Sequence, residues 1–329
     1  MRRRTFIALM GGAVASPFAA RAQANARVSR IGFLTPRSRP SPATHDAFSG
    51  AFLQGMTELG YTEGKNLIVE WRYADGNYTH LTGFATELVG MNLPVIVTYG
   101  TAAARALQKA TTTTPIVVAA AVDLVGAGIV ESLARPGRNV TGLSVIDVDI
   151  SEKQLQLLRA FSPRLSRVGV LLNPDNSANE LVGRHVEITG TSIGVVVVPV
   201  RAATPQNIET AFAEAARQGA GAVVIAADAF FSGQGPQIAA SAARYRLPTI
   251  SLYRDHVLAG CLMSYGQNVA EFHRRAATYV DKILKGAKPQ ELPVEQPSKF
   301  DLLINARTAA ALGLVVPQEL LVSADEVIE

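Results

Sequence analysis

Short runs of apolar, β-branched residues alternate along the chain with longer segments whose apolar residues recur every three or four positions. The short runs predict strands buried on both faces, and the longer segments predict amphipathic helices packed against them. In the first part of the chain this predicts strands at 30–34, 66–72, 94–98 and 116–119, with helices at 43–59, 81–89 and 102–110. The order β-α-β-α-β-α-β is typical of a doubly wound parallel sheet.

A second half repeats this order of elements. It has predicted strands at 167–172, 195–200, 222–226 and 248–252, and predicted helices at 178–189, 206–218 and 237–245. The two halves are joined by a short helix at 125–133, a brief strand at 140–144 that leaves the first half, and a helix at 151–161. After them come a strand at 260–264, a helix at 269–284, a proline-rich linker at 286–297, a strand at 299–304 and a helix at 306–312. The pattern therefore predicts two similar lobes that share the C-terminal part.

Ligands of open parallel sheets bind beyond the carboxyl ends of the strands. The loops at these ends carry the candidate ligand-binding residues Thr35, Tyr99, Gly100, Thr101, Ala121 and Asp123 in the first lobe, Asn173, Asp228 and Tyr253 in the second, and Tyr265 after a later strand. We expect a carboxylate of the ligand to lie at the helix start formed by Gly100 and Thr101, because the first N–H groups of a helix lack partners and its dipole favours an anion.

Other candidates have more than one interpretation. Asp123 or Asp228 could pair with an ammonium group, but a turn or helix-cap role fits each of them equally well. The aromatic residues Tyr99, Phe230, Tyr253 and Tyr265 could pack on an apolar or aromatic ligand, or instead pack the hinge and the lobes. No Arg or Lys directly follows the strand at 94–98, which favours neutral donors there, and Arg254 is the nearest candidate for a charged helper.

The N-terminal segment has the pattern of an export signal. Basic residues at 2–4 precede a mostly apolar stretch at 5–20, and a small-x-small pattern ends at Ala22. We expect cleavage after Ala22 and a mature chain in the periplasm. The apolar stretch is shorter than a bilayer requires and is interrupted by glycine and proline, which argues against a membrane anchor. Arg3 and Arg4 are similar to the twin-arginine export signal, whereas Arg2 and Ala8 depart from it, so ordinary Sec export remains open.

Composition narrows the function further. The chain has 329 residues, enough for about two domains. Its net charge of +4 equals the four arginines of the first 22 residues, so the expected mature chain has no net charge and nucleic-acid binding loses its main support. Cys261 is the single cysteine, which excludes an intrachain disulfide and a thiolate-rich metal site. The five histidines are scattered, and neither a phosphate-binding loop nor a nucleophile elbow is present, so we expect no metal and no cofactor.

Five ordered segments form a distinctive set: AFLQGMTELGYTEGKNL (51–67), SLARPGRNVTGLS (132–144), LMSYG (262–266), ILKGAKPQELPVEQPSKFDLLIN (283–305) and TAAALGLVVP (308–317). They resemble the substrate-binding proteins of ABC importers, in the group that includes tryptophan- and tyrosine-binding members. The similarity runs from Ile31 to Glu329. It implies the type I periplasmic-binding fold, an α/β architecture of two Rossmann-like lobes with parallel sheets, joined by a three-crossing hinge and closing over a ligand.

The resemblance also implies a domain division and partners. It places the crossings near Ser144, near Leu252 and within 289–297. We therefore expect the signal peptide at 1–22, lobe 1 at 23–143 plus 253–288, and lobe 2 at 144–252 plus 289–329. The implied partners are a small-molecule ligand and an ABC transporter permease with its cytoplasmic ATPase. We expect a monomer that binds no nucleic acid.

The predicted function is that of a periplasmic substrate-binding protein of an ABC importer, which captures a small carboxylate-bearing solute, an amino acid or an aromatic acid, without catalysis. The alternative is an exported α/β enzyme acting on a small acid, although no acid–base–nucleophile set is recognisable. A ligand-sensing core like those of repressors is a third interpretation. The export signal and the absence of a helix-turn-helix motif before Ile31 argue against it.

Overall fold

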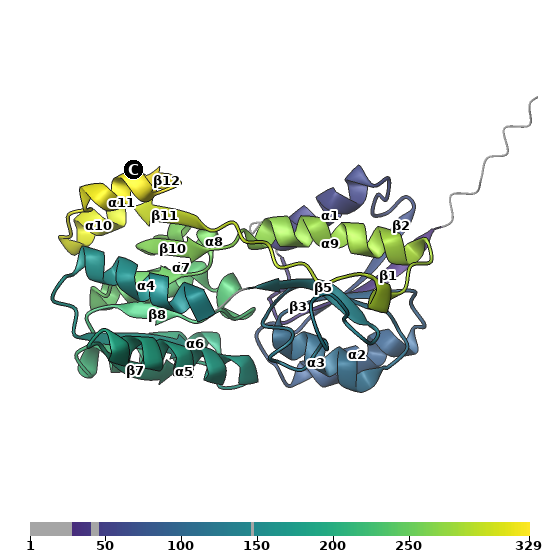
Figure 1. Cartoon of the computed structure of the whole chain (residues 1–329), viewed down its shortest axis with the longest axis horizontal. Helices are drawn as coiled ribbons and strands as arrows, with labels where there is room; N and C mark the ends of the chain where they lie inside the picture. The colour runs from purple at the N-terminus through teal and green to yellow at the C-terminus, as the bar shows by residue number, and fades with distance from the viewer. Residues whose placement is uncertain (1–27, 41–45, 146–147) are drawn as a thin grey trace, which may run out of the picture.

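The computed structural model describes residues 28–40, 46–145 and 148–329, which form two α/β lobes side by side along the long axis (Figure 1). Each lobe is a mainly parallel sheet with helices on both faces, which confirms the predicted α/β fold with two lobes. The predicted signal peptide at 1–22 lies outside the described residues. Within the described part, no helix is both long and apolar enough to cross a membrane.

The first lobe contains a sheet of five parallel strands in the order β2-β1-β3-β4-β5. These strands are β1 (Ser29–Thr35), β2 (Leu67–Tyr73), β3 (Ile96–Tyr99), β4 (Ile116–Val122) and β5 (Val140–Val145). Helices α1 (Ala47–Glu58) and α9 (Val269–Leu284) cover one face, and α2 (His80–Gly90) and α3 (Thr101–Ala110) cover the other (Figure 1). Because side chains alternate along a strand, Phe33 of β1 packs on Phe52 of α1, whereas Leu34 joins the core beneath α2 and α3.

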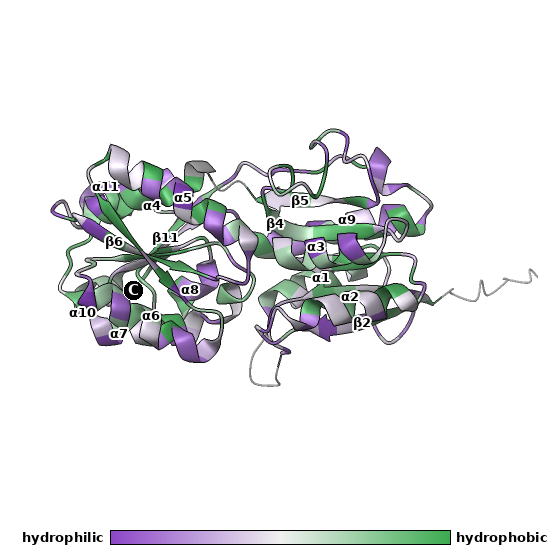
Figure 2. Cartoon of the chain, turned by 90° about the horizontal axis from the view of Figure 1, so that it is seen from below, coloured by the Kyte–Doolittle hydropathy of each residue, from purple (hydrophilic) through white to green (hydrophobic). Residues whose placement is uncertain are grey.

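The second lobe contains a seven-stranded sheet in the order β12-β11-β10-β9-β8-β6-β7, in which only the β10–β11 pair is antiparallel. Its strands are β6 (Arg167–Leu172), β7 (Val196–Arg201), β8 (Val223–Ile225), β9 (Thr249–Ser251), β10 (Met263–Gly266), β11 (Asp301–Asn305) and β12 (Glu326–Ile328). Its helices are α4 (Val148–Phe161), α5 (Ser177–Ser192), α6 (Pro205–Arg217), α7 (Gly235–Tyr245), α8 (Arg254–Leu258), α10 (Ala306–Leu312) and α11 (Gln318–Ser323). Figure 2 shows the division of polarity: strands such as β6 are largely hydrophobic, whereas helices such as α5 alternate hydrophobic and hydrophilic residues.

Two predictions of local structure are wrong. The segment at 125–133 forms turns instead of a helix. Asp123 and Gly128 have φ angles of 41° and 67°, outside the helical region. In addition, Arg105 of α3 donates a hydrogen bond to the carbonyl oxygen of Ala127 at 2.6 Å, so this carbonyl is not available to a helix. The strand at 140–144 does not leave the first lobe but pairs with β4 as the edge strand β5. The short elements α8, α11 and β12 were not predicted, because three to six residues carry too little periodicity.

The crossings between the lobes also differ from the prediction. The expected crossing near Leu252 is wrong, because Met263 of β10 pairs with Ile250 of β9 on one side and Ile304 of β11 on the other, so the chain stays in the second sheet through Gly266. Residues 289–295 remain with the first lobe, where Glu295 exchanges backbone hydrogen bonds with β5. The chain therefore passes between the lobes after β5, between β10 and α9, and between Glu295 and β11.

A close helix crossing supports the first lobe. A Cβ atom on Gly55 of α1 would stand 2.3 Å from the carbonyl oxygen of Arg274 in α9, whereas Gly50 in the same helix has nothing within 4 Å. Only the absence of a side chain at Gly55 therefore allows α1 and α9 to approach this closely.

We predict opposite effects of alanine at these two glycines. Gly55→Ala should lower the free energy of unfolding of the first lobe by about 1–3 kcal/mol, because α9 must shift. Gly50→Ala should raise it by about 0.5–1 kcal/mol through helix propensity. Urea unfolding followed by the fluorescence of Trp71, the single tryptophan, reports this lobe. Equal effects of the two substitutions would contradict the close crossing.

Candidate ligand-binding cleft

The carboxyl ends of the strands of the two lobes face each other across a narrow cleft, as the sheet rule predicts. A cavity of about 20 Å³ lies there, between the ends of β3, β4 and β5 in the first lobe and those of β8 and β9 in the second. Its lining includes six of the predicted residues: Tyr99, Gly100, Thr101, Ala121, Asp228 and Tyr253. The structure therefore brings together residues that are up to about half the chain length apart.

Asp228 presents a buried carboxylate to this cleft, and it is 2% exposed. Its Oδ1 accepts hydrogen bonds from Asn173 Nδ2 at 3.2 Å and from the Phe230 N–H at 2.9 Å. Its Oδ2 accepts from Asn176 Nδ2 at 2.7 Å and from the Tyr78 hydroxyl at 2.9 Å. Burial raises the pKa of Asp228, while these donors counteract the rise. Among the described residues no cationic side chain forms an ion pair with Asp228.

The start of helix α3 faces Asp228 from the other lobe. Gly100 has a φ angle of 86°, and a Cβ on it would stand 2.9 Å from the Cβ of Ala229, so glycine is required both by conformation and by the contact. The helix begins without a side-chain cap, which leaves the N–H groups of its first turn as donors. The Thr101 hydroxyl donates to the carbonyl of Val122 at 3.2 Å, so it fixes the turn rather than pointing a free donor into the cleft.

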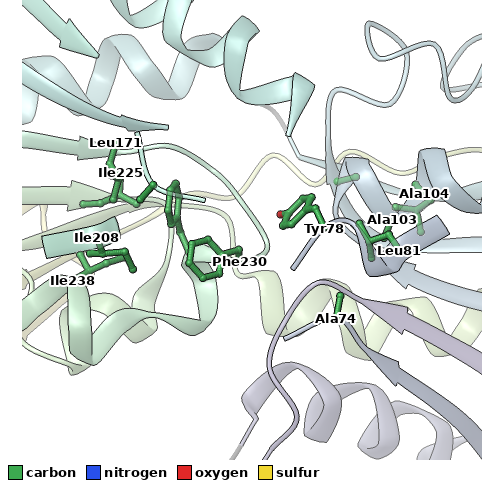
Figure 3. Close-up of a cluster of buried hydrophobic side chains, with 14 of the residues drawn as sticks. Ala74, Tyr78, Leu81, Ala103, Ala104, Leu171, Ile208, Ile225, Phe230 and Ile238 are labelled. Atoms are coloured by element: carbon green, nitrogen blue, oxygen red, sulfur yellow. The ribbon is translucent and has the colours of Figure 1, made fainter. Parts of the chain in front are cut away.

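Tyrosine side chains join the lobes across the cleft. The Tyr253 hydroxyl donates to the carbonyl oxygen of Asp228 at 3.0 Å and lies 3.4 Å from the hydroxyl of Tyr99. Figure 3 shows Tyr78 pointing from the first lobe towards Phe230 of the second. Burial raises the pKa of Tyr78 and of Tyr253 well above the usual value, so both phenols remain protonated donors at neutral pH.

Arg37 is a residue of the cleft that the sequence reasoning missed. Its guanidinium Nη1 donates to Ser232 Oγ of the second lobe at 2.6 Å, and its Nη2 lies 3.1 Å from the carboxylate of Asp46. The predicted residue Thr35 holds this arginine in place, because its Oγ1 accepts from the Arg37 N–H at 3.2 Å. A cation two residues beyond the end of β1 was the signal that could have identified it.

The structure places the remaining candidates differently. Asn173 reaches the cleft through its hydrogen bond to Asp228, whereas Thr35, Asp123 and Tyr265 do not line the cavity. Asp123 is exposed, and its Oδ1 accepts from the Gly126 N–H at 2.8 Å, as in an ordinary turn. Tyr265 stacks on Phe300, with ring centroids 5.6 Å apart.

Asn176 and Tyr78 also contact Asp228 in the cleft, and neither is among the residues predicted from the sequence. Asn176 lies three residues after the predicted Asn173, in the same polar turn that follows β6, and that turn is its sequence signal. Tyr78 lies beyond β2, a strand whose loop the sheet rule does not place in the cleft, and no sequence pattern indicated it.

Comparison with known proteins places the chain in a family. The family model for the ABC transporter substrate binding protein matches residues 40–328. The chain belongs to this family. A tyrosine-binding protein of Clostridioides difficile is 23% identical over 269 residues, which are 82% of this chain and 77% of that protein. The resemblance in sequence to substrate-binding proteins is thereby confirmed.

Solved structures agree with the fold. A conserved domain protein from Vibrio cholerae superposes with a TM-score of 0.84 at 28% identity, over 92% of this chain and 100% of that chain. An ABC domain from Streptococcus pneumonia in complex with L-Trp superposes with a TM-score of 0.81 at 24% identity, over 91% and 100% of the chains. The chain is thus a substrate-binding protein of the ABC transporter class. This is a family of solute-binding proteins rather than of enzymes, and its members are typically periplasmic or extracellular.

Two buried histidines border the cleft. His256 packs on Tyr253, and its Nε2 bonds to the carbonyl of Phe231 at 2.9 Å. His273 stacks on Phe48, and its Nδ1 bonds to the carbonyl of Val269 at 2.8 Å. Burial lowers the pKa of each histidine to about 4. Both therefore stay neutral in the folded protein at pH values where the unfolded chain binds a proton.

We predict that this difference destabilises the protein at mildly acidic pH. A histidine with a lowered folded pKa contributes its full stability above about pH 6.5 and loses it as the pH falls towards 4. At pH 5 the loss should be about 2 kcal/mol for each histidine. Urea unfolding at pH 7 and pH 5 measures it: His256→Gln should reduce the difference, and His80→Gln, at an exposed position, should leave it unchanged. An unchanged difference in His256→Gln would contradict the assignment.

Proposed function

We propose that the protein binds an α-amino acid between its two lobes and delivers it to an ABC importer. Asp228 of the second lobe pairs with the ammonium group. The first turn of α3 in the first lobe holds the carboxylate, with the backbone N–H groups as donors. The observation that carries this proposal is that a buried carboxylate and an uncapped helix start line one cavity from opposite lobes.

The cleft supports an aromatic side chain on this ligand. Tyr99 and Tyr253 line the cavity, and Phe230 and Tyr78 lie next to it, so an aromatic ring would find aromatic neighbours on both lobes. A tyrosine-binding relative and the L-Trp complex of a structural neighbour point to the same chemical class. L-tyrosine and L-tryptophan are therefore the first ligands to test.

Binding requires the lobes to separate and close again. A volume of about 20 Å³ holds about one water molecule, far less than an amino acid needs. The lobes are joined by hydrogen bonds from Tyr78 to Asp228 and from Arg37 to Ser232, both of which must break for entry. On closure the ligand's ammonium group takes a place beside Asp228, and the three crossings serve as the hinge.

The charge of the ligand is tested by matched variants and analogues. Asp228→Asn should weaken binding of L-tyrosine by about ten- to a hundredfold, because a hydrogen bond to a charged group is lost. Asp123→Asn, at an exposed aspartate outside the cavity, should leave the affinity unchanged. L-tyrosinamide should bind more weakly by the same order through loss of its carboxylate. Calorimetry gives the dissociation constants, and equal affinities of wild type and Asp228→Asn would place the ammonium group elsewhere.

Closure is tested at the contact between Gly100 and Ala229. Gly100→Ala should hold the lobes apart and abolish the decrease in radius of gyration that L-tyrosine produces in small-angle scattering. Gly128→Ala has a comparable positive φ angle, but its Cβ would meet nothing within 4 Å, so it controls for backbone strain alone. Normal closure of Gly100→Ala would show that the lobes do not meet at this point in the bound state.

Export is proposed to follow the N-terminal signal, with cleavage after Ala22 and release into the periplasm. N-terminal sequencing of the protein from a periplasmic extract should begin at Gln23. Replacing Arg3 and Arg4 together by lysine should retain the precursor in the cytoplasm if the twin-arginine route is used, and should leave export intact if Sec is used. A chain recovered from membranes with Met1 intact would refute the proposed cleavage.

A further inference from the structure

A second cavity, of about 170 Å³, lies at the hinge beside the crossing between β10 and α9. It is lined by Phe48 of α1 in the first lobe, by Asp255 of α8, by Ser264 of β10 and by the first residues of α9. Leu252, Tyr253 and Val269 line both this cavity and the cleft. The hinge cavity is therefore adjacent to the cleft, but its polar groups are different.

Asp255 contributes a negative charge to the hinge cavity, and Arg37 and Arg254 act on it only as nearby charges, not as direct partners. Its carboxylate is half-buried and forms no hydrogen bond or ion pair with any residue that the structure describes. The neighbouring Arg254 is engaged by Glu326 through two hydrogen bonds of 2.6 and 2.8 Å. Asp301, which also lines the cavity, is paired with Lys299 at 2.9 Å. Asp255 is therefore the acidic side chain of this lining that has no direct ion-pair partner among the described residues.

Ser264 provides a second, independent indication of a ligand. The residue is 2% exposed, and its hydroxyl has no hydrogen-bond partner within residues 28–40, 46–145 and 148–329. Because the residue lines the cavity, this hydroxyl can donate to or accept from a ligand there. Its cross-strand neighbour Leu303 lines the same cavity, which places Ser264 between an apolar wall and the open volume.

We propose that the hinge cavity binds a primary amine with a small apolar body. The ammonium group pairs with Asp255 and donates a hydrogen bond to the Ser264 hydroxyl oxygen, while Phe48, Leu252 and Leu303 enclose the apolar part. Among the described residues no group of three His, Cys, Asp or Glu side chains could hold a metal ion, which favours an organic cation. Phe48 belongs to the first lobe and Asp255 to the second, so the shape of this site depends on the angle between the lobes. The affinity for the amine therefore depends on that angle.

The test uses 3-methylbutylamine as the probe. The control 3-methylbutan-1-ol has the same hydrocarbon chain and no charge, and L-leucine has the same amine and chain with an added carboxylate. The amine should bind, whereas the alcohol should bind at least tenfold more weakly. Amide chemical shifts should move at Gly266 and Ala270 rather than at Gly100 and Thr101. Asp255→Asn should weaken amine binding about ten- to a hundredfold and Ser264→Ala severalfold, while Asp228→Asn should have no effect.

Three outcomes would overturn the inference. The first is equal binding of the amine and the alcohol, which would remove the role of charge. The second is loss of amine binding in Asp228→Asn with shifts at Gly100, which would place the amine in the cleft. The third is L-leucine binding that depends on Asp255, which would make the hinge cavity the amino-acid site. Loss of L-tyrosine binding in Asp228→Asn is a separate measurement, so the proposed function and this inference can fail independently.

Discussion

The buried carboxylate of Asp228 is the group on which the arrangement of the cleft depends. Desolvating a carboxylate is expensive, and here the cost is offset by five neutral donors, from Asn173, Asn176, Tyr78 and the N–H groups of Phe230 and Phe231. Four of these donors belong to the second lobe, and Tyr78 comes from the first. Most hydrogen bonds to the carboxylate therefore come from its own lobe, and the one from Tyr78 comes from the other lobe. Separation of the lobes breaks the bond from Tyr78, which leaves an acceptor position that suits the cationic group of the proposed ligand.

The two sheets place an uncapped helix start and a buried carboxylate at the same cavity from opposite lobes. The end of β3 presents the uncapped start of α3, and the end of β8 presents Asp228, with Gly100 allowing the two lobes to meet at Ala229. Parallel sheets direct all their carboxyl ends to one edge, so two such lobes facing each other necessarily place loops of both in the cleft. The fold therefore determines where the loops lie, whereas the side chains of a few loops determine which ligand the cleft binds.

Regular periodicity accounts for what the sequence predicts well, and long-range contacts account for what it does not. Helices such as α9 and strands such as β6 follow from their apolar pattern, and the family follows from ordered motifs at 51–67 and 283–305. The membership of β10 in the second sheet was missed because strand pairing with Ile250 and Ile304 leaves no local signal. Likewise, Tyr78 enters the cleft from a loop 150 residues away from Asp228, a contact that only the fold creates.

The most direct test of the account is a crystal structure of the protein with L-tyrosine bound. We expect the ammonium nitrogen within hydrogen-bond distance, about 3 Å, of Asp228 and the carboxylate at the first turn of α3, with Tyr78 displaced from Asp228. An amino acid bound with its carboxylate on the second lobe, or bound at Asp255 in the hinge cavity, would contradict the proposed division of charge between the two lobes.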